Sequence, residues 1–253
     1  KNIVKCVSKA GLELDKLVLE PLASSSSVLT EEEKEAGVAL IDIGGGTTDI
    51  AIFQDGIIRH TAVIPFGGKA ISQDISNGCT IMAKHAEKLK CKFGSALSQE
   101  MKENELVCIP GLQGRPPKEI SLKNLASIIE ARTQEIIEHV HYEIKASGFG
   151  EQLIGGIVVT GGGSQLRHIT QLFQYVTGLD CRVGYPNEHL HEPPSDTNIP
   201  SFSTGVGLVI RGYEDQRLTD SKDPLRKKKE KRNGFMDKFL NNIKTWFEEE
   251  QDY

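Results

Sequence analysis

Long apolar runs are absent from this 253-residue sequence, and so are closely spaced cysteines. The longest apolar stretch, residues 153–159, is far shorter than the roughly 20 residues that a membrane-spanning helix needs. No charged segment followed by an apolar one opens the chain, so we expect no secretory signal. Five cysteines without a C-x-x-C pair argue against a disulfide framework and against a zinc site. These absences favour a soluble cytosolic protein, and 38% hydrophobic residues suffice for a core.

An even distribution of charge is missing as well. The net charge of −5 conceals a basic segment, residues 222–232, with a local charge of +5, and a following segment, residues 233–253, at −3. Residues 1–221 therefore carry −7. A protein that coats nucleic acid would spread positive charge over a folded surface, so this acidic body argues against a nucleic-acid partner.

A triple glycine joins two predicted strands in the first part of the chain. Residues 37–43 and 49–53 are apolar and rich in β-branched side chains, and Asp55-Gly56 predicts a tight turn into a third strand at 57–64. Glycines let backbone N–H groups approach a phosphate, threonines add hydroxyl donors, and an aspartate can hold hydrated Mg²⁺. The candidate residues are Asp42, Gly44, Gly45, Gly46, Thr47 and Thr48. Taken alone, such a loop is equally consistent with a glycine-rich hairpin without a ligand.

A second triple glycine changes that balance. Residues 157–159 form another predicted buried strand, and Gly161, Gly162 and Gly163 follow it, with a helix expected to begin near Ser164. Two strand–glycine units about 115 residues apart are hard to attribute to chance, since each costs conformational entropy.

Between the two loops lies an E-x-x-K pair, Glu87 and Lys90, within a predicted helix at residues 83–92. On its own this pair is typical of an exposed i,i+3 ion pair. A longer helix is predicted from residue 122 to Gly148, where apolar side chains recur at helical spacing. The serines at 24–27 predict a loop.

Together these motifs resemble the actin-like ATPase superfamily of actin, the DnaK-type chaperones and the sugar kinases. In that superfamily the phosphate-2 motif is similar to residues 42–49 and the adenosine motif to residues 158–164. The E-x-x-K residues of its members contact ribose and adenine, as Glu87 and Lys90 would here. The resemblance therefore implies bound ATP and Mg²⁺, with Asp42 holding the metal ion through water.

Further segments resemble the FtsA family of bacterial cell-division proteins, over residues 1–220. They are residues 19–24, residues 63–68 with Asp74 after them, residues 86–94, and residues 200–207 with Gly205 and Gly207. The implied fold is an α/β, actin-like (ribonuclease-H-like) ATPase lobe with an inserted α+β subdomain and a C-terminal amphipathic helix. The family's N-terminal lobe, which carries the phosphate-1 loop, has no counterpart here. We therefore expect the C-terminal part of a larger protein, with weak ATP binding and at most weak ATPase activity.

The resemblance also predicts a division of the chain into parts. Residues 1–36 would be the tail of the first lobe, residues 37–78 and 151–200 the core of the second lobe, residues 79–150 the inserted subdomain, residues 201–217 the closing helix of the first lobe, residues 218–232 a basic flexible linker, and residues 233–250 an amphipathic membrane-targeting helix.

The last predicted helix separates its apolar and polar side chains completely when placed at about 100° per residue. Its apolar side chains are Phe235, Met236, Phe239, Leu240, Ile243, Trp246 and Phe247. This composition suits the headgroup boundary of a bilayer, and the basic residues Lys227, Lys228 and Lys229 would be attracted to anionic lipid. The alternative is a helix that docks on the protein's own core or in a partner's groove.

The resemblance implies partners and a place in the cell. We expect the chain to bind the FtsZ C-terminal tail through residues 79–150, with Arg132 as a candidate contact, to assemble with itself into actin-like filaments, and to meet other divisome proteins. Its location would be the cytoplasmic face of the bacterial inner membrane, at the septum. Two alternatives stay open: a phosphotransferase or ATPase enzyme of the same superfamily, and a pilus-assembly or shape-determining actin homologue.

Overall fold

The computed structural model describes residues 2–102, 104–111, 116–186 and 196–222. The chain divides into two units, residues 1–208 and residues 209–253. The last described helix begins in the first unit and ends in the second. In chain order the elements are α1 (Asn2–Lys9), α2 (Glu20–Val28), α3 (Glu31–Ala36), β1 (Val38–Ile43), β2 (Thr48–Gln54), β3 (Ile57–Ile64), α4 (Gly68–Gly78), α5 (Ala83–Phe93), β4 (Leu106–Ile109), β5 (Lys118–Ser121), α6 (Leu122–Ala146), η1 (Gly150–Gln152), β6 (Ile157–Thr160), η2 (Gly162–Gln165), α7 (Ile169–Thr177), β7 (Cys181–Val183), η3 (Pro200–Phe202) and α8 (Ser203–Lys222).

A mixed five-stranded sheet in the order β3-β2-β1-β6-β7 forms the centre of the first unit. Strand β1 pairs antiparallel with β2 and parallel with β6, so Asp42 lies opposite Asp49 on one side and Thr160 on the other. The strand–glycine–strand connection expected for residues 37–53 is confirmed. Because β1 and β6 are parallel neighbours, both glycine loops leave the sheet at the same edge.

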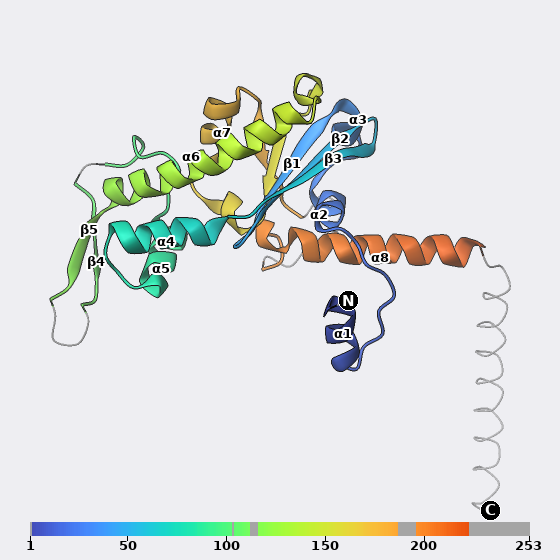
Figure 1. Cartoon of the computed structure of the whole chain (residues 1–253), viewed down its shortest axis with the longest axis horizontal. Helices are drawn as coiled ribbons and strands as arrows, with labels where there is room; N and C mark the ends of the chain where they lie inside the picture. Colours follow the sequence, from blue (N-terminus) through green and yellow to red (C-terminus); the bar gives the residue numbers. More distant parts are fainter. Residues whose placement is uncertain (1, 103, 112–115, 187–195, 223–253) are drawn as a thin grey trace, which may run out of the picture. The chain divides into compact units, whose positions relative to one another are not determined.

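Each face of the sheet is covered by helices (Figure 1). On one face, alternate side chains such as Ile41, Ile52 and Val159 pack into the larger core together with residues of α4, α6 and α7. On the other face, Leu40 and Phe53 pack against the end of α2 in a smaller cluster. The long helix predicted from residue 122 is confirmed as α6, which buries one apolar stripe along its whole length.

The serine-rich segment 24–27, predicted to be a loop, is helical and belongs to α2. Serine favours turns because its hydroxyl competes for backbone groups. Here the hydroxyls bond back within the helix, as from Ser25 to the Leu22 carbonyl over 3.0 Å, or cross to other elements, as from Ser27 to the Ser203 carbonyl over 2.7 Å. The prediction is wrong because tertiary contacts decide this segment.

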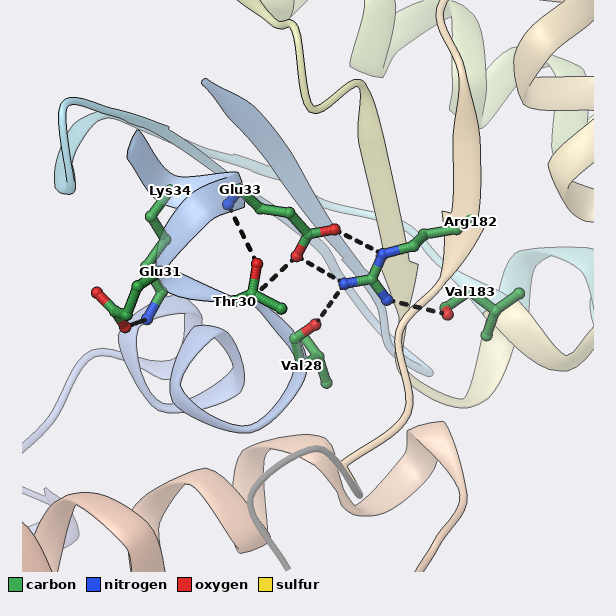
Figure 2. Close-up of polar contacts among 7 residues, drawn as sticks. All are labelled: Val28, Thr30, Glu31, Glu33, Lys34, Arg182 and Val183. Atoms are coloured by element: carbon green, nitrogen blue, oxygen red, sulfur yellow. Dashed lines mark hydrogen bonds and ion pairs between the residues drawn. The ribbon is translucent and has the colours of Figure 1, made fainter. Parts of the chain in front are cut away.

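Arg182, whose side chain is 37% exposed, links the edge strand β7 to α2 and α3 (Figure 2). Thr30 and Glu33 form a capping box at the start of α3. The guanidinium of Arg182, on β7, donates to both carboxylate oxygens of Glu33 over 2.7 Å and to the Val28 carbonyl over 2.9 Å. Burial raises the pKa of Glu33, but the hydrogen bonds from Arg182 and from the Thr30 backbone outweigh it, and the net pKa lies below its usual value.

The closing helix α8 runs to Lys222 instead of ending at residue 217. The basic segment beyond it and the predicted amphipathic helix at 233–250 lie outside the described residues. Within the described ranges, every helix is too short or too polar to cross a bilayer.

Candidate functional site

Both glycine loops and the E-x-x-K pair line one cavity of about 310 Å³. The sequence-predicted residues along its wall are Gly44, Gly45, Glu87, Lys90, Gly162 and Gly163. Further wall residues, which were not among the predicted site residues, are Gly68, Ile71, Cys91, Gln165, Leu166 and Ser201. The parallel pairing of β1 with β6 places the two loops beside each other, and α5 adds Glu87 and Lys90 from a third element.

The glycines of the second loop are required by close packing against the end of β1. Gly161 has φ +80°, and a Cβ there would lie 2.3 Å from Asp42 Oδ1. A Cβ on Gly163 would lie 2.3 Å from Ile43 Cγ2. Gly46 in the first loop faces open space, and no heavy atom lies within 4 Å of its built Cβ. The second loop is therefore locked onto the sheet, whereas the first leaves room for a ligand to approach its backbone.

Asp42 is almost fully buried, at 6% exposed, between two helices. Ser24 on α2 donates a hydrogen bond to Asp42 Oδ2 over 2.9 Å, and Thr204 on α8 lies 3.4 Å from the same oxygen. Burial raises the pKa of Asp42; the Ser24 hydrogen bond opposes this only in part, and Asp49 raises it further. The contacts with Ser24 and Thr204 both involve Oδ2, so among the described residues Asp42 Oδ1 accepts no hydrogen bond and is the oxygen that would face a hydrated cation.

Glu20, which the sequence did not suggest as a site residue, lies near enough to Asp42 and Asp49 to be affected by their charges, although it is not part of the cavity wall. It begins α2, and its pKa is raised by burial and then by the charges of Asp49 and Asp42. Three carboxylates with mutually unfavourable charge create a negative potential near the first glycine loop, and hard oxygen ligands of this kind suit Mg²⁺. Among the described residues, however, no three carboxylate, histidine or cysteine side chains come together as the direct ligands of a metal ion, so the predicted Mg²⁺ would be held by Asp42 through water. The sequence signals were the place of Glu20 within residues 19–24, which resemble the FtsA family, and its position directly before Pro21.

The loop hydroxyls bond within the protein. Thr48 is fully buried and donates to the Phe66 carbonyl over 3.0 Å, Ser164 donates to the Gly161 carbonyl over 2.8 Å, and Thr47 donates to Asp49 over 3.0 Å. These bonds shape the loops, which leaves backbone N–H groups as the donors for a phosphate. The helix expected to begin near Ser164 does not do so: residues 162–165 form the short turn η2, and α7 starts at Ile169.

Glu87 and Lys90 form an ion pair with 2.9 Å between Oε2 and Nζ. The Lys90 side chain is only 13% exposed, against 50% for Glu87, so the pair is not an ordinary solvated one. Lys90 also donates to the Gly68 carbonyl over 2.8 Å. Gly68 in turn donates its N–H to the Gly44 carbonyl over 2.9 Å. The pair is thereby connected to the first glycine loop through the start of α4.

Arg132 lies on α6 and is engaged within the protein. Its Nε is 2.5 Å from Asp74 Oδ2 on α4, and its Nη1 bonds to Glu135 on its own helix. The hydrogen bond to Asp74 raises the pKa of Arg132, so its positive charge is secured. Asp74 was part of the sequence resemblance, and the structure gives that residue a partner.

Comparison with known families decides the assignment. The sequence model of the family described as "Cell division protein FtsA" matches residues 39–207. The chain belongs to the FtsA family. Cell division protein FtsA of Pseudomonas aeruginosa is 42% identical over 219 residues, which cover 85% of this chain and 52% of that protein. FtsA of Borreliella burgdorferi is 37% identical over 258 residues, which cover 98% of this chain and 59% of that protein.

The chain thus spans about half the length of the FtsA proteins that it matches. Membership of this family of cell-division proteins favours a part of a division protein over the pilus-assembly and shape-determining alternatives.

Solved structures confirm the predicted actin-like fold. MreB5 of Spiroplasma citri bound to AMPPNP superimposes with a TM-score of 0.68 at 23% identity, covering 88% of this chain and 66% of that one. A chain of the PilM–PilN type IV pilus biogenesis complex superimposes with a TM-score of 0.63 at 19% identity, covering 83% of this chain and 56% of that one. At such identities the likeness concerns the fold of the FtsA-family chain and nothing finer.

Proposed function

We propose that this chain is the ATP-binding, membrane-associated part of an FtsA that tethers FtsZ filaments to the cytoplasmic face of the bacterial inner membrane at the septum. The observation that carries the nucleotide part is the meeting of both glycine loops with Glu87 and Lys90 in one cavity. The backbone of residues 44–46 would hold phosphates, Asp42 would hold Mg²⁺ through water, and Glu87 with residues 161–164 would hold the adenosine. MreB5, which shares the fold, was solved with AMPPNP and with ADP.

Within the described residues, the backbone proposed to hold phosphates belongs to the first glycine loop, and the chain spans about half the length of its FtsA relatives. Clamping of a triphosphate is strongest where donors surround it. We therefore expect ATP affinity to be weak in this chain and to increase when the lobe that precedes it in full-length relatives is present. On this proposal the protein acts by forming an assembly and not by releasing a reaction product. Hydrolysis of ATP would then be at most a regulatory event.

The membrane part of the proposal is supported by sequence pattern alone. Partial burial of seven large apolar side chains supplies on the order of 5–10 kcal/mol before helix ordering is subtracted. Each nearby lysine or arginine adds about 1 kcal/mol of attraction to anionic lipid. Such a helix is a reversible anchor, and many copies in a filament would hold firmly through avidity.

Flotation with anionic liposomes tests the anchor. The whole chain should float, and a chain without residues 233–253 should stay at the bottom. Two matched substitutions sharpen the test, because both add one negative charge to the predicted helix: Ile243→Asp lies at the centre of its apolar face and Asn241→Asp on its polar face. Loss of flotation for Ile243→Asp alone supports membrane insertion of the apolar face, and equal flotation of the truncated chain would contradict the tether.

We also propose that residues 79–150 receive the FtsZ C-terminal tail, with Arg132 as a contact. The pairing of Arg132 with Asp74 holds the guanidinium in place while leaving its side chain 29% exposed. Arg132→Ala and Asp74→Asn both break this ion pair, but only the first removes the positive charge. Co-sedimentation of the chain with FtsZ should be lost in Arg132→Ala and retained in Asp74→Asn; equal loss in both would make Arg132 a structural residue.

A further inference from the structure

A serine behind the cavity contacts both members of the E-x-x-K pair. Ser72, on α4, is 8% exposed and does not belong to the cavity wall. Its Oγ bonds to Glu87 Oε2 and accepts a hydrogen bond from Lys90 Nζ over 2.9 Å. Ser72 therefore connects two side chains on α5 from a position that a nucleotide in the cavity would not touch.

The Ser72 hydroxyl has a single hydrogen, and this decides which of its contacts it donates to and which it accepts from. A hydroxyl has one hydrogen to donate, and both Glu87 Oε2 and the Gly68 carbonyl, 3.2 Å away, are in reach of it. The charged carboxylate is the stronger acceptor. Ser72 thus donates to Glu87 and accepts from Lys90, which fixes the orientation of the carboxylate.

Lys90 uses all its donors inside the protein. An ammonium has three N–H groups, and Lys90 Nζ has three acceptors: the Gly68 carbonyl at 2.8 Å, Ser72 Oγ at 2.9 Å and Glu87 Oε2 at 2.9 Å. Among the described residues, the one donor to Glu87 Oε1 is the thiol of Cys91, a weak donor 3.3 Å away. Glu87 is therefore the member of the pair that can still accept hydrogen bonds from a ligand. Lys90 and Ser72 hold its carboxylate in place.

We propose that Ser72 is a positioning residue that orients Glu87 to accept hydrogen bonds from the sugar hydroxyls of a ribonucleotide. This inference rests on the proposed ATP site and adds a specificity to it: preference for a ribose with both hydroxyls. The same contacts would also fix the distance between the sugar and the phosphates of the nucleotide. Lys90 and Ser72 connect α5 to the start of α4. There the N–H groups of Gly68 and Lys69 donate to the carbonyls of Gly44 and Gly45, in the first glycine loop, over 2.9 and 2.8 Å.

The contact itself can be tested without nucleotide. Burial raises the pKa of Glu87, but hydrogen bonds from Ser72 and Lys90 outweigh it and leave the net pKa below its usual value. Titration of the Glu87 carboxyl followed by NMR should show a higher pKa in Ser72→Ala than in the parent. Ser76→Ala is the matched control, because Ser76 lies one turn further along α4 and bonds to the Ile81 carbonyl instead. An unchanged Glu87 pKa in Ser72→Ala would overturn the inference.

The sugar specificity is tested by comparing ATP with 2′,3′-dideoxy-ATP on the whole chain. A misoriented charged acceptor should weaken ATP binding about tenfold in Ser72→Ala, with a change of less than about twofold for the dideoxy analogue. Ser76→Ala should bind both as the parent does. Equal losses for both nucleotides in Ser72→Ala would overturn the positioning role while leaving the ATP site intact. A parent chain that binds neither nucleotide would overturn the ATP site and the sugar specificity together.

Discussion

The contact between α2 and α8 is so close that one methyl group should break it. Gly207 on α8 is buried, and a Cβ built on it would lie 1.8 Å from the Ala23 carbonyl oxygen and 2.5 Å from its carbon. These are backbone atoms, which cannot move aside by rotamer change. Gly205, on the same helix, is exposed and has no heavy atom within 4 Å of its built Cβ. The two positions form a matched pair for glycine-to-alanine substitution.

The expected effects have opposite signs. In a helix, alanine is favoured over glycine by about 1 kcal/mol, so Gly205→Ala should leave the free energy of unfolding unchanged or raise it by up to that amount. At Gly207 the same gain is outweighed by overpacking, which costs about 1–3 kcal/mol and more where backbone must shift. We expect a net loss of about 2 kcal/mol, which for a domain of this size is a fall in Tm of about 4–8 °C.

Urea and thermal unfolding of the two variants, followed by far-UV circular dichroism, measure the difference. The variants carry the same chemical change on one helix, so intrinsic helix propensity cancels in the comparison. Equal stability of Gly205→Ala and Gly207→Ala would refute the close crossing of α2 and α8 and, with it, the placement of Thr204 beside Asp42.

Three further predictions concern the loops and the charges. Gly161→Ala should lower the free energy of unfolding by about 2 kcal/mol, because its backbone is left-handed and its Cβ would displace Asp42, while Gly46→Ala should change it by less than about 0.5 kcal/mol in the same urea titrations. Asp42→Asn should abolish the Mg²⁺ dependence of ATP binding measured by calorimetry. Burial raises the pKa of Asp42, so in the parent chain the Mg²⁺ dependence should weaken, as the pH falls, at a higher pH than an ordinary aspartate would give. Glu33→Gln should lower stability by about 1 kcal/mol at neutral pH. Because folding lowers the pKa of Glu33, its contribution exists above the unfolded-state pKa and is lost on acidification, so the two proteins should become equally stable in acid; a difference that persists there would contradict the ion pair with Arg182.

The strands and the two glycine loops could be predicted from local sequence patterns, whereas their common site was implied by the family resemblance. Continuous apolar runs at residues 37–43 and 157–159 mark strands that are buried on both faces, and glycine triplets mark where each strand ends. The periodicity of α6 was equally clear, since one stripe of it is buried along its full length.

The remaining features arise from contacts between distant segments. Ser24 to Ser27 are helical because their hydroxyls find partners up to 180 residues away, as Ser24 does at Thr204. Glu20 lies near the site only because the fold brings it to Asp42 and Asp49, and Ser72 only because α5 packs on α4. The sequence near these residues cannot reveal such distant partners, because serine and glutamate are mostly found on solvated surfaces, where they need no partner in the protein.

The parallel pairing of β1 with β6 has a consequence for the newborn chain. Strands β1, β2 and β3 follow one another directly and can pair as soon as they are made, whereas β6 begins only at Ile157. A ribosome must therefore deliver most of the first unit before the second glycine loop can join the first. Until then a nascent chain has the loop proposed to hold phosphates without the loop proposed to hold adenosine. If the proposed ATP site is correct, nucleotide stabilises the first unit only after β6 has been made, as a ligand of the finished sheet and not as a guide to its early folding.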